Sequence, residues 1–311
     1  MNSPKKISVV IPVLNEEKTL PSLLSALASQ TLQPNEIFFI DAGSTDQSKE
    51  IIRSWTKLCL TEANVILIDN PSGMPGANRN IGVQNASPSN WIAFIDAGIT
   101  PKKNWLSSLV QTAESENAKT VFGRCKFKSY SAFQTAVCAL SYGCTSKPVM
   151  PNSLFHPDIF LETAAGLFRG DLRAAEDTLW LSKLDSIAPK RIPTPNIISE
   201  YTHFPRNTPE VIQKWGSYEW HINKAGISRK KVDCLILFFT IAVISPWINF
   251  YLTLIMMAIY ISSRGIADPI YRSKSIFWWK TFPTSFFYAI YLGIMIDFAI
   301  CKSRISFALS R

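Results

Sequence analysis

Four groups of polar residues in the first hundred positions follow short apolar runs and carry the residue types of a nucleotide site. The side chains concerned are Asn15 and Glu16, Asp41, Asn78 and Arg79, and Asp96. Carboxylates accept hydrogen bonds from a nucleobase or a ribose. An arginine at a glycine-rich helix start suits a diphosphate, because backbone N–H groups add to its charge. A carboxylate that faces a diphosphate usually requires a divalent cation between them. The residue types therefore indicate a nucleoside diphosphate bound with a metal ion.

Asp96 has two interpretations. It ends an apolar stretch in the sequence WIAFIDAGITP and is followed by Ala97 and Gly98. Strand ends are where α/β proteins hold ligands. Asp96 is therefore either half of a metal and phosphate site without its second acid, or a polar cap on a buried strand. The chain has no GxGxxG after its first strand and no GxxxxGK[ST], so hydride transfer and P-loop phosphoryl transfer lose support.

Alternating strands and helices are expected to position these groups. Apolar runs predict strands at residues 7–14, 36–41, 65–68 and 91–95. Leucines at helical spacing predict a helix at residues 19–30. This alternation favours right-handed βαβ units and a mostly parallel α/β sheet.

The topology predicts where the polar groups meet. Parallel strands end along one edge of a sheet, so Glu16, Asp41 and Asp96 are expected to converge on one crevice. Beyond residue 100 the pattern loosens. It predicts a strand at residues 121–127, helices at 131–143 and 172–184, and a loop at 189–195.

The end of the chain is basic and apolar. Residues 202–311 contain 13 Lys and Arg against 5 Asp and Glu, so they hold nearly all of the net charge of +9. Basic clusters beside apolar segments indicate an anionic membrane surface more than a nucleic acid. Membrane attachment is therefore expected, and no nucleic-acid partner.

Two apolar segments are candidates for that attachment. Residues 232–261 contain one charge, Asp233, and residues 282–300 contain one acid, Asp297. The first segment is either one tilted, kinked span or two half-length helices that turn at Ser245-Pro246. Positive charges lie on every side of both segments. A re-entrant hairpin with an interfacial helix therefore fits better than two full spans.

Five sequence motifs together resemble those of family-2 inverting glycosyltransferases of the GT-A fold. In chain order they are SVVIPVLNEEKTL, SQTLQPNEIFFIDAGSTDQS, GANRNIGV, FIDAGITPKKNWL and RAAEDTLW. The resemblance covers about residues 5–215. It implies a nucleotide-sugar-binding domain whose mostly parallel, twisted sheet is flanked by helices.

The resemblance also implies roles for particular residues. Pro12, Asn15, Glu16 and Asp41 would hold the nucleoside, and Asn78 and Arg79 would face the diphosphate. Asp96 matches the first aspartate of the family's DxD element. These assignments stand on the match of each residue to its motif.

Two departures from the family bear on the site. The second aspartate of DxD is replaced by Gly98, which weakens the expected metal site. Ala42 stands where many members have an aspartate, so one nucleobase contact is expected to be missing. A divalent cation, Mg²⁺ or Mn²⁺, is still expected at Asp96, with His203 as a candidate second ligand. The remaining ligands would be the diphosphate and water.

The Glu176-Asp177 pair matches the family's catalytic base. Inverting transfer is one displacement, in which a carboxylate takes the proton of the incoming hydroxyl. Asp177 begins an amphipathic segment, and a helix N-terminus stabilises an ionised carboxylate. Asp177 is therefore the predicted base. Glu176 is the alternative base, or else steadies the loop or contacts acceptor hydroxyls.

The sequence thus predicts a GT-A glycosyltransferase domain at residues 1–228 and a membrane-associated helical region at 229–311. The expected reaction is inverting transfer of a sugar from a nucleotide-sugar donor to a hydroxyl acceptor, lipid-linked or polysaccharide. The expected place is the cytoplasmic face of the cell membrane, in cell-envelope polysaccharide synthesis. The alternatives are a nucleotidyltransferase-like enzyme, or a catalytically weakened scaffold or binding subunit of a glycan assembly complex.

Overall fold

The structure is a computed structural model that describes residues 5–58, 61–187 and 191–310. It divides the chain into two compact units. The first comprises Met1–Lys126 and Ser146–Tyr201, and the second comprises Phe127–Thr145 and Thr202–Arg311. This division differs from the predicted boundary at residue 228. The reason is that two helices placed before that boundary by the sequence, α5 (Ala132–Ser141) and α7 (Thr208–Lys224), pack against the last helix of the chain.

Within the described residues, eight strands form one sheet, which belongs to the first unit. They are β1 (Ile7–Val13), β2 (Glu36–Asp41), β3 (Asn64–Asp69), β4 (Trp91–Ile95), β5 (Ile99–Pro101), β6 (Thr120–Phe127), β7 (Ser146–Phe155) and β8 (Ile192–Tyr201). Their order is β3-β2-β1-β4-β7-β6-β8-β5. The strands β3, β2, β1 and β4 are parallel, whereas β7 runs antiparallel to β4 and β6, and β5 runs antiparallel to β8. The predicted α/β class is confirmed.

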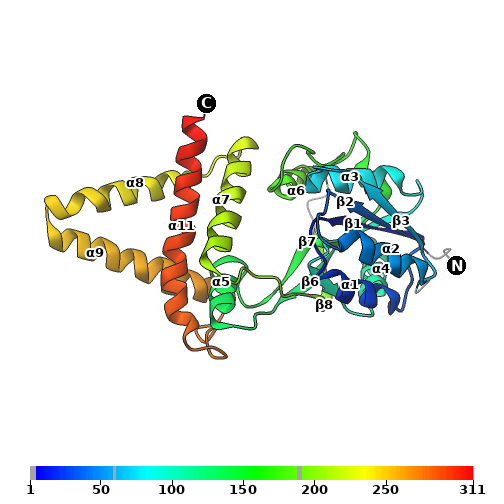
Figure 1. Cartoon of the computed structure of the whole chain (residues 1–311), viewed down its shortest axis with the longest axis horizontal. Helices are drawn as coiled ribbons and strands as arrows, with labels where there is room; N and C mark the ends of the chain where they lie inside the picture. Colours follow the sequence, from blue (N-terminus) through cyan, green and yellow to red (C-terminus); the bar gives the residue numbers. More distant parts are fainter. Residues whose placement is uncertain (1–4, 59–60, 188–190, 311) are drawn as a thin grey trace. The chain divides into compact units, whose positions relative to one another are not determined.

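Helices cover both faces of this sheet (Figure 1). Those of the first unit are α1 (Leu20–Ala28), α2 (Ser48–Lys57), α3 (Pro75–Asn85), α4 (Trp105–Ser115) and α6 (Glu176–Ile187). Helices α1, α2 and α4 bury Leu23, Trp55 and Leu109 in one core cluster. Helices α3 and α6 contribute Ile81 and Trp180 to a second cluster. The sheet is therefore the middle of three layers.

Strand β2 shows why the first strands are continuously apolar. Ile37 and Phe39 belong to the core cluster with α1 and α2, while Phe38 and Ile40 belong to the cluster with α3. A strand that is covered on both faces has no solvent side, so it needs no polar alternation.

The parallel strands end in register. Val13 pairs with Asp41, and Asp41 pairs with Asp69 on the next strand. The loops after β1, β2 and β3 therefore start side by side at one edge of the sheet, which is the geometry that the sequence predicts.

Two predicted elements differ from the structure. Residues 192–195, predicted as part of a loop at 189–195, begin strand β8, while residues 188–190 lie outside the described residues. Pro193 and Pro195 precede residues 199–201, which pair with β5, so the two prolines interrupt none of the hydrogen bonds to that strand. The helix predicted from residue 172 begins at Glu176. Ala175 has a φ of 68°, a left-handed conformation that cannot continue a helix.

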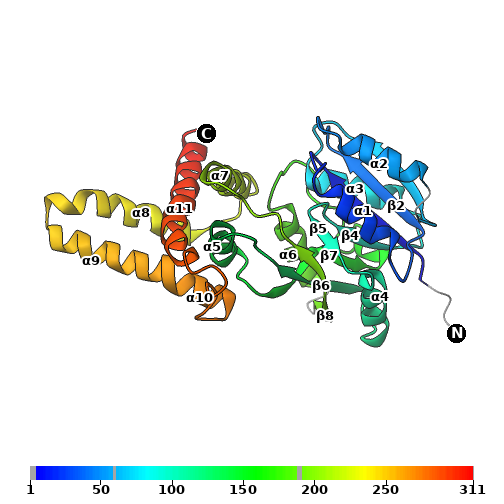
Figure 2. The ribbon, with the colours of Figure 1, turned by 60° about the horizontal axis from the view of Figure 1, so that its bottom comes forward.

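The second unit is helical. In addition to α5 and α7 it contains α8 (Lys230–Ile244), α9 (Phe250–Tyr260), the π-helical segment η3 (Ile261–Ala267), α10 (Asp268–Ser273) and α11 (Ser285–Leu309). Helix α11 packs against α7 and α5, and η3 also contacts it. Figures 1 and 2 both show α8 and α9 side by side as a hairpin.

The apolar segments become helices of two kinds. A short turn, η2 (Ser245–Trp247), separates α8 from α9, so the alternative of two helices turning at Ser245-Pro246 is confirmed. By length and composition, Phe250–Ser273 and Ser285–Leu309 are apolar enough to cross a membrane. The most apolar window of the first is 11% buried and that of the second 50% buried. The second is therefore also a packing helix of its unit.

Candidate active site

The loop after β1 is held by hydroxyl and amide groups of the loop after β2. The Oγ of Ser44 accepts from the N–H of Asn15 at 2.9 Å, and the Oγ of Ser48 accepts from the N–H of Glu16 at 2.7 Å. In return, Oδ1 of Asn15 accepts from the N–H of Thr45 at 2.9 Å. Asn15 has a φ of 55°, a conformation that asparagine adopts more readily than most residues. The two predicted nucleoside loops thus form one cross-braced rim.

Glu16 and Pro12 lie on that rim. The carboxylate of Glu16 accepts a hydrogen bond from the hydroxyl of Thr19, three residues further on. Pro12 is the half-buried next-to-last residue of β1 and pairs in register with Ile40. Both predicted residues therefore lie next to the end of β2.

Asp41 is fully buried at the end of β2. Its Oδ2 accepts from the backbone N–H groups of Gly43 and Ser44, each at 2.9 Å, which fixes the turn. Its Oδ1 is buried without a hydrogen-bond partner among the described residues. Lys49 lies 4.0 Å from Oδ2 of Asp41 and 3.5 Å from Asp69. A buried carboxylate oxygen without a donor is uncommon in proteins and fits a donor supplied by a ligand.

Helix α3 directs three consecutive side chains to three different places. Asn78 accepts from the amide of Asn70 at 2.7 Å and donates to the carbonyl of Ile40 at 3.4 Å, at the ends of β3 and β2. Asn80 exchanges two hydrogen bonds of 2.8 Å with the backbone of Phe168. Between them, Arg79 extends toward the end of β4.

Arg79 joins two carboxylates. Its Nη2 lies 2.7 Å from Oδ1 of Asp96, and its Nη1 lies 2.8 Å from Oε1 of Glu176. The side chains of Arg79 and Glu176 are 5% and 7% exposed, while that of Asp96 is 41% exposed. Thus Asp96 presents carboxylate surface to solvent, and Glu176 does not. The structure brings these three predicted residues together.

Burial and charge act in opposite directions within this cluster. Burial raises the pKa of Glu176, and the neighbouring Asp177 raises it further, while the charge of Arg79 opposes both. Burial alone would lower the pKa of Arg79, but the charges of Asp96 and Glu176 outweigh it and raise the pKa. Arg79 is therefore a permanent cation that ties the end of β4 to the start of α6.

Asp177 differs from Glu176 in exposure. Glu176 is the first residue of α6 and is buried, whereas Asp177 is the second and is only partly buried. The Oδ1 of Asp177 accepts from the N–H of Thr178 at 2.7 Å, at the free N-terminal end of the helix. Of the two acids, Asp177 is the one that a substrate can reach.

Few of the described side chains at the site could coordinate a metal ion. Among the described residues, no group of three or more His, Cys, Asp and Glu side chains could hold a metal ion. Mg²⁺ in phosphate sites is commonly held by one or two carboxylates together with substrate oxygens, and the exposed carboxylate of Asp96 fits that chemistry. His203 belongs to the second unit, and its role as a ligand stays a prediction.

The contacts of Asn80, Ser44 and Ser48 were not predicted from the sequence. Asn80 follows Arg79 in the ANRN motif, so its place in that motif was the available signal. Ser44 and Ser48 hold the backbone of Asn15 and Glu16 from across the site. Such a contact, about 30 residues away along the chain, has no local pattern.

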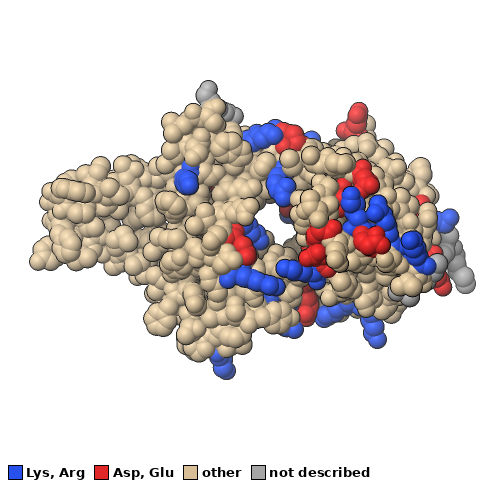
Figure 3. Space-filling view, in the orientation of Figure 1, with Lys and Arg blue, Asp and Glu red and all other residues tan. Residues whose placement is uncertain are grey.

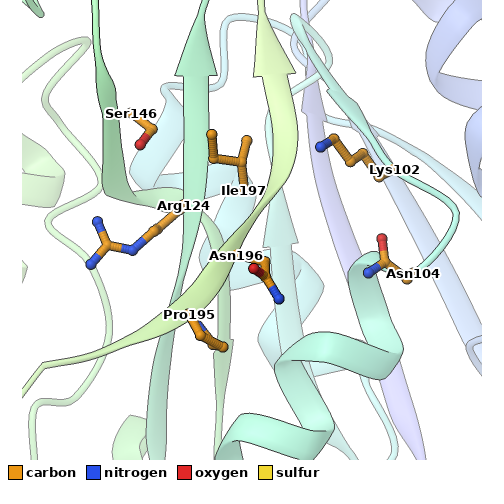
Figure 4. A pocket seen from close by; sticks show the side chains of 7 residues that line it. All are labelled: Lys102, Asn104, Arg124, Ser146, Pro195, Asn196 and Ile197. Atoms are coloured by element: carbon orange, nitrogen blue, oxygen red, sulfur yellow. The ribbon is translucent and has the colours of Figure 1, made fainter.

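A separate cavity of about 720 Å³ lies elsewhere in the first unit. Its lining residues are Lys102, Asn104, Arg124, Ser146, Pro195, Asn196 and Ile197. Figure 4 shows them around β6 and β8, with Lys102 and Arg124 on different sides of the strands. None of the predicted site residues lines it, so it is not part of the candidate active site.

The strand order and the helices on both faces of the sheet define an α/β protein with a GT-A-like fold. The model of glycosyl transferase family 2 matches residues 8–154, so this stretch of the chain is similar to that family. Glycosyltransferase AglE from Haloferax volcanii is 32% identical over 123 residues, which are 39% of this chain and 40% of that protein.

Two further comparisons are with a relative named for a lipid phosphate and with a solved structure. The undecaprenyl-phosphate 4-deoxy-4-formamido-L-arabinose transferase of Photorhabdus laumondii is 33% identical over 120 residues, which are 35% of this chain and 34% of that protein. The chain therefore spans less than half of the length of these relatives. Among solved structures, the mannosyltransferase PcManGT from Pyrobaculum calidifontis, in complex with GDP-Man and Mn²⁺, matches with a TM-score of 0.54 and 15% identity. That match covers 96% of this chain and 88% of the other and supports the fold.

Proposed function

We propose that the chain is an inverting glycosyltransferase that moves a sugar from a nucleotide-sugar donor to a hydroxyl of a membrane-associated acceptor. The observation that carries this proposal is the bridge of Arg79 between Asp96 and Glu176. It brings the end of β4, which is the predicted diphosphate side, beside the start of α6, which carries the predicted base. A polar cap on a strand, the other interpretation of Asp96, would need no such bridge.

The rim formed by the β1 and β2 loops is proposed to hold the nucleoside. Asp41 offers a buried carboxylate oxygen that lacks a donor among the described residues, and an N–H of the base can supply one. Pro12, Asn15 and Glu16 lie beside it, and Asn78 links this rim to α3. The two loops of this rim are thus held together by hydrogen bonds before the donor binds.

Arg79 is proposed to act on the diphosphate mainly through its position and charge. Both of its terminal nitrogens already bond carboxylates, so it holds Asp96 in place while its positive charge faces the donor side. Asp96 would hold a Mg²⁺ or Mn²⁺ ion together with diphosphate oxygens. When bound, such an ion stabilises negative charge on the leaving group.

Asp177 is proposed as the catalytic base. Its carboxylate takes the proton of the acceptor hydroxyl as the oxygen bonds to the anomeric carbon. On the opposite face the bond from that carbon to the phosphate oxygen breaks, and the nucleoside diphosphate leaves with the electron pair. Glu176 is buried against Arg79 and is proposed to position this turn rather than to accept the proton.

A lipid-linked acceptor at the cytoplasmic face of the cell membrane completes the proposal. It is supported by the apolar helices of the second unit and by the relative named for undecaprenyl-phosphate. Synthesis of a cell-envelope polysaccharide fits such an acceptor.

The decisive experiment compares Asp177→Asn with Asp185→Asn. Both acids lie on α6, and Asp185 is a surface residue that bonds Arg191. Release of nucleoside diphosphate from UDP-, GDP- and dTDP-sugars is measured with a polyprenyl-linked saccharide, which offers sugar hydroxyls, as acceptor, with and without Mn²⁺. We expect Asp177→Asn to lose about 10²-fold or more of the turnover while nucleotide still raises its melting temperature. We expect Asp185→Asn to behave like the wild type. Equal turnover in the wild type and Asp177→Asn would overturn the assignment of the base.

A further inference from the structure

The hairpin of α8 and α9 is an uncharged projection of the second unit. Residues 234–263 contain no Lys, Arg, Asp or Glu. In the space-filling view of Figure 3, the surface of this hairpin carries no charged colour. Large apolar side chains at its tip are open, with Trp247 82% exposed and Ile248 76% exposed. Exposed apolar surface of this extent marks an interaction site.

Four polar side chains of the hairpin, those of Thr240, Ser245, Asn249 and Thr253, form hydrogen bonds within the hairpin itself. At the tip, the hydroxyls of Ser245 and Thr253 lie 2.7 Å apart, and Oδ1 of Asn249 accepts from the N–H of Leu252 at 3.2 Å. The hydroxyl of Thr240 donates to the carbonyl of Ile236 at 2.9 Å. A turn in water can bond to solvent, whereas a turn in lipid must satisfy its polar groups internally. The hydrogen bonds of Ser245, Thr253 and Asn249 at the tip are internal, as a turn in lipid requires.

The uncharged part of each arm of the hairpin is too short to cross a bilayer by itself. The uncharged part of α8, residues 234–244, spans about 16 Å at 1.5 Å per residue. The uncharged part of the second arm, residues 250–263, spans about 21 Å. The hydrocarbon core is about 30 Å thick, so each arm reaches about the middle of the membrane.

Both arms end in charged groups that contact the same helix. At the start of α8, Asp233 bonds Arg304 of α11 at 3.1 Å. At the end of the other arm, Arg264 bonds Asp297 of α11 at 3.0 Å. Tyr260 adds a hydrogen bond of 2.8 Å to Asp297. The two ends of the hairpin therefore lie on one side, where paired charges hold them.

We propose that α8 and α9 form a re-entrant hairpin that enters a single leaflet of an anionic lipid bilayer and returns to the same side. Lys230 and Lys231, which are exposed at the start of α8, lie at the height of the lipid headgroups and contact their phosphates. Helix α11 is half-buried against its own unit and supports the hairpin from the headgroup side. This inference rests on the membrane association included in the proposed function and does not depend on the reaction.

Cysteine labelling from one side of the membrane tests the inference. Full-length protein is added to preformed, sealed vesicles of phosphatidylcholine and phosphatidylglycerol and recovered by flotation. Trp247→Cys marks the tip and Ser275→Cys marks the region beyond the second arm, both in a Cys234→Ser parent that gives the background. A membrane-impermeant maleimide is supplied outside, inside, or with detergent.

We expect Ser275→Cys to react from outside only. Trp247→Cys is expected to react about tenfold more slowly from either side until detergent is added, because the reactive thiolate is excluded from hydrocarbon. Ile248→Cys serves as a second tip variant if Trp247→Cys does not fold. Rapid labelling of the tip from inside would show a crossing hairpin, and rapid labelling from outside would show a hairpin outside the lipid. Either result overturns the inference, whereas failure of the protein to float would refute membrane association itself.

Charge substitution gives an independent readout. Lys230→Gln and Lys231→Gln are each expected to weaken binding to the anionic vesicles about fivefold at low salt, and to leave binding to pure phosphatidylcholine unchanged. Lys183→Gln on α6 of the first unit is the matched control. Equal loss of binding on both vesicle types would contradict the headgroup contact.

Discussion

Arg79 and Glu176 are 97 residues apart in the chain, and their side chains meet at 2.8 Å in the interior of the first unit. One of them lies in the second turn of α3 and the other begins α6. The pair therefore fixes the start of α6, and with it Asp177, relative to the end of β4.

The stability of this pair is the first prediction. Arg79→Met is expected to cost about 3–5 kcal/mol of unfolding free energy, because it leaves Glu176 buried without its cation. The double variant with Glu176→Met is expected to cost less than the sum of the single variants. Denaturant unfolding in detergent micelles measures both. The surface variant Arg191→Met, which breaks a pair with Asp185, is the control and should cost less than about 1 kcal/mol. Strictly additive costs at Arg79 and Glu176 would contradict the coupling.

The approach of α3 to the segment before α6 is the second prediction. A Cβ at Gly76 would lie 2.5 Å from the carbonyl oxygen of Arg169 and 3.2 Å from the Cβ of Phe168. Gly76→Ala is therefore expected to destabilise the protein by about 1–3 kcal/mol. A Cβ at Gly216 on α7 would have no neighbour nearer than 3.8 Å, so Gly216→Ala should stabilise that helix by up to about 1 kcal/mol. Melting temperatures that move in the same direction for both variants would argue against this packing.

The third prediction concerns nucleotide affinity. Asp41→Asn replaces a buried carboxylate by a neutral amide, and its charge-assisted hydrogen bonds to the turn and to the ligand weaken. We expect the Kd for nucleoside diphosphates to rise about 10- to 100-fold, measured by calorimetry. Asp69→Asn is the control, because Asp69 is the register partner of Asp41 but is half-exposed. An unchanged Kd for Asp41→Asn would remove Asp41 from the nucleoside site.

The fourth prediction is a pH dependence that originates in the second unit. Burial lowers the pKa of Lys214 from 10.5 to about 8, and its ammonium lies over the rings of Tyr142 and Trp215 at 5.7 and 5.5 Å. Between about pH 8 and 10.5 the unfolded chain binds more protons at this residue than the folded chain does. The contribution of Lys214 to stability therefore rises with pH across that window, by about 3 kcal/mol in total.

Melting curves between pH 7 and 10 measure that contribution. The difference between the wild type and Lys214→Met isolates it from other titrating groups. A difference that stays constant with pH, or that changes in the opposite direction, would contradict the lowered pKa.

The first half of the sheet could be predicted from the sequence because its signal is local. Strands β1 to β4 are apolar runs that pack against the core on both faces, although β3 at the edge of the sheet is only partly buried. Each ends in a polar turn whose position follows from parallel topology. In the antiparallel half only β6 has such a signal, and the strand predicted at residues 121–127 is confirmed. Strand β7 contains Pro148 and Pro151, and β8 contains Pro193 and Pro195, which are residues that indicate a loop when read alone.

The contacts of the candidate site also fall into those that the sequence predicts and those that it does not. The convergence of Arg79 and Asp96 followed from their strand and helix ends. The burial of Glu176 against Arg79 did not, because it depends on the path of the chain between β7 and α6. Asn80 was missed for the same reason, since its partner is the backbone of Phe168, 88 residues away.

Asn78, Arg79 and Asn80 occupy three successive positions of α3, and successive side chains on a helix are about 100° apart. They therefore span about 200° of the circumference of the helix and tie the strand edge, the charged cluster and the Phe168 segment to a single turn. Adding or deleting one residue before this turn would rotate all three side chains away from their partners at once. The same change after Asn85, where the helix has ended, would leave all three in place.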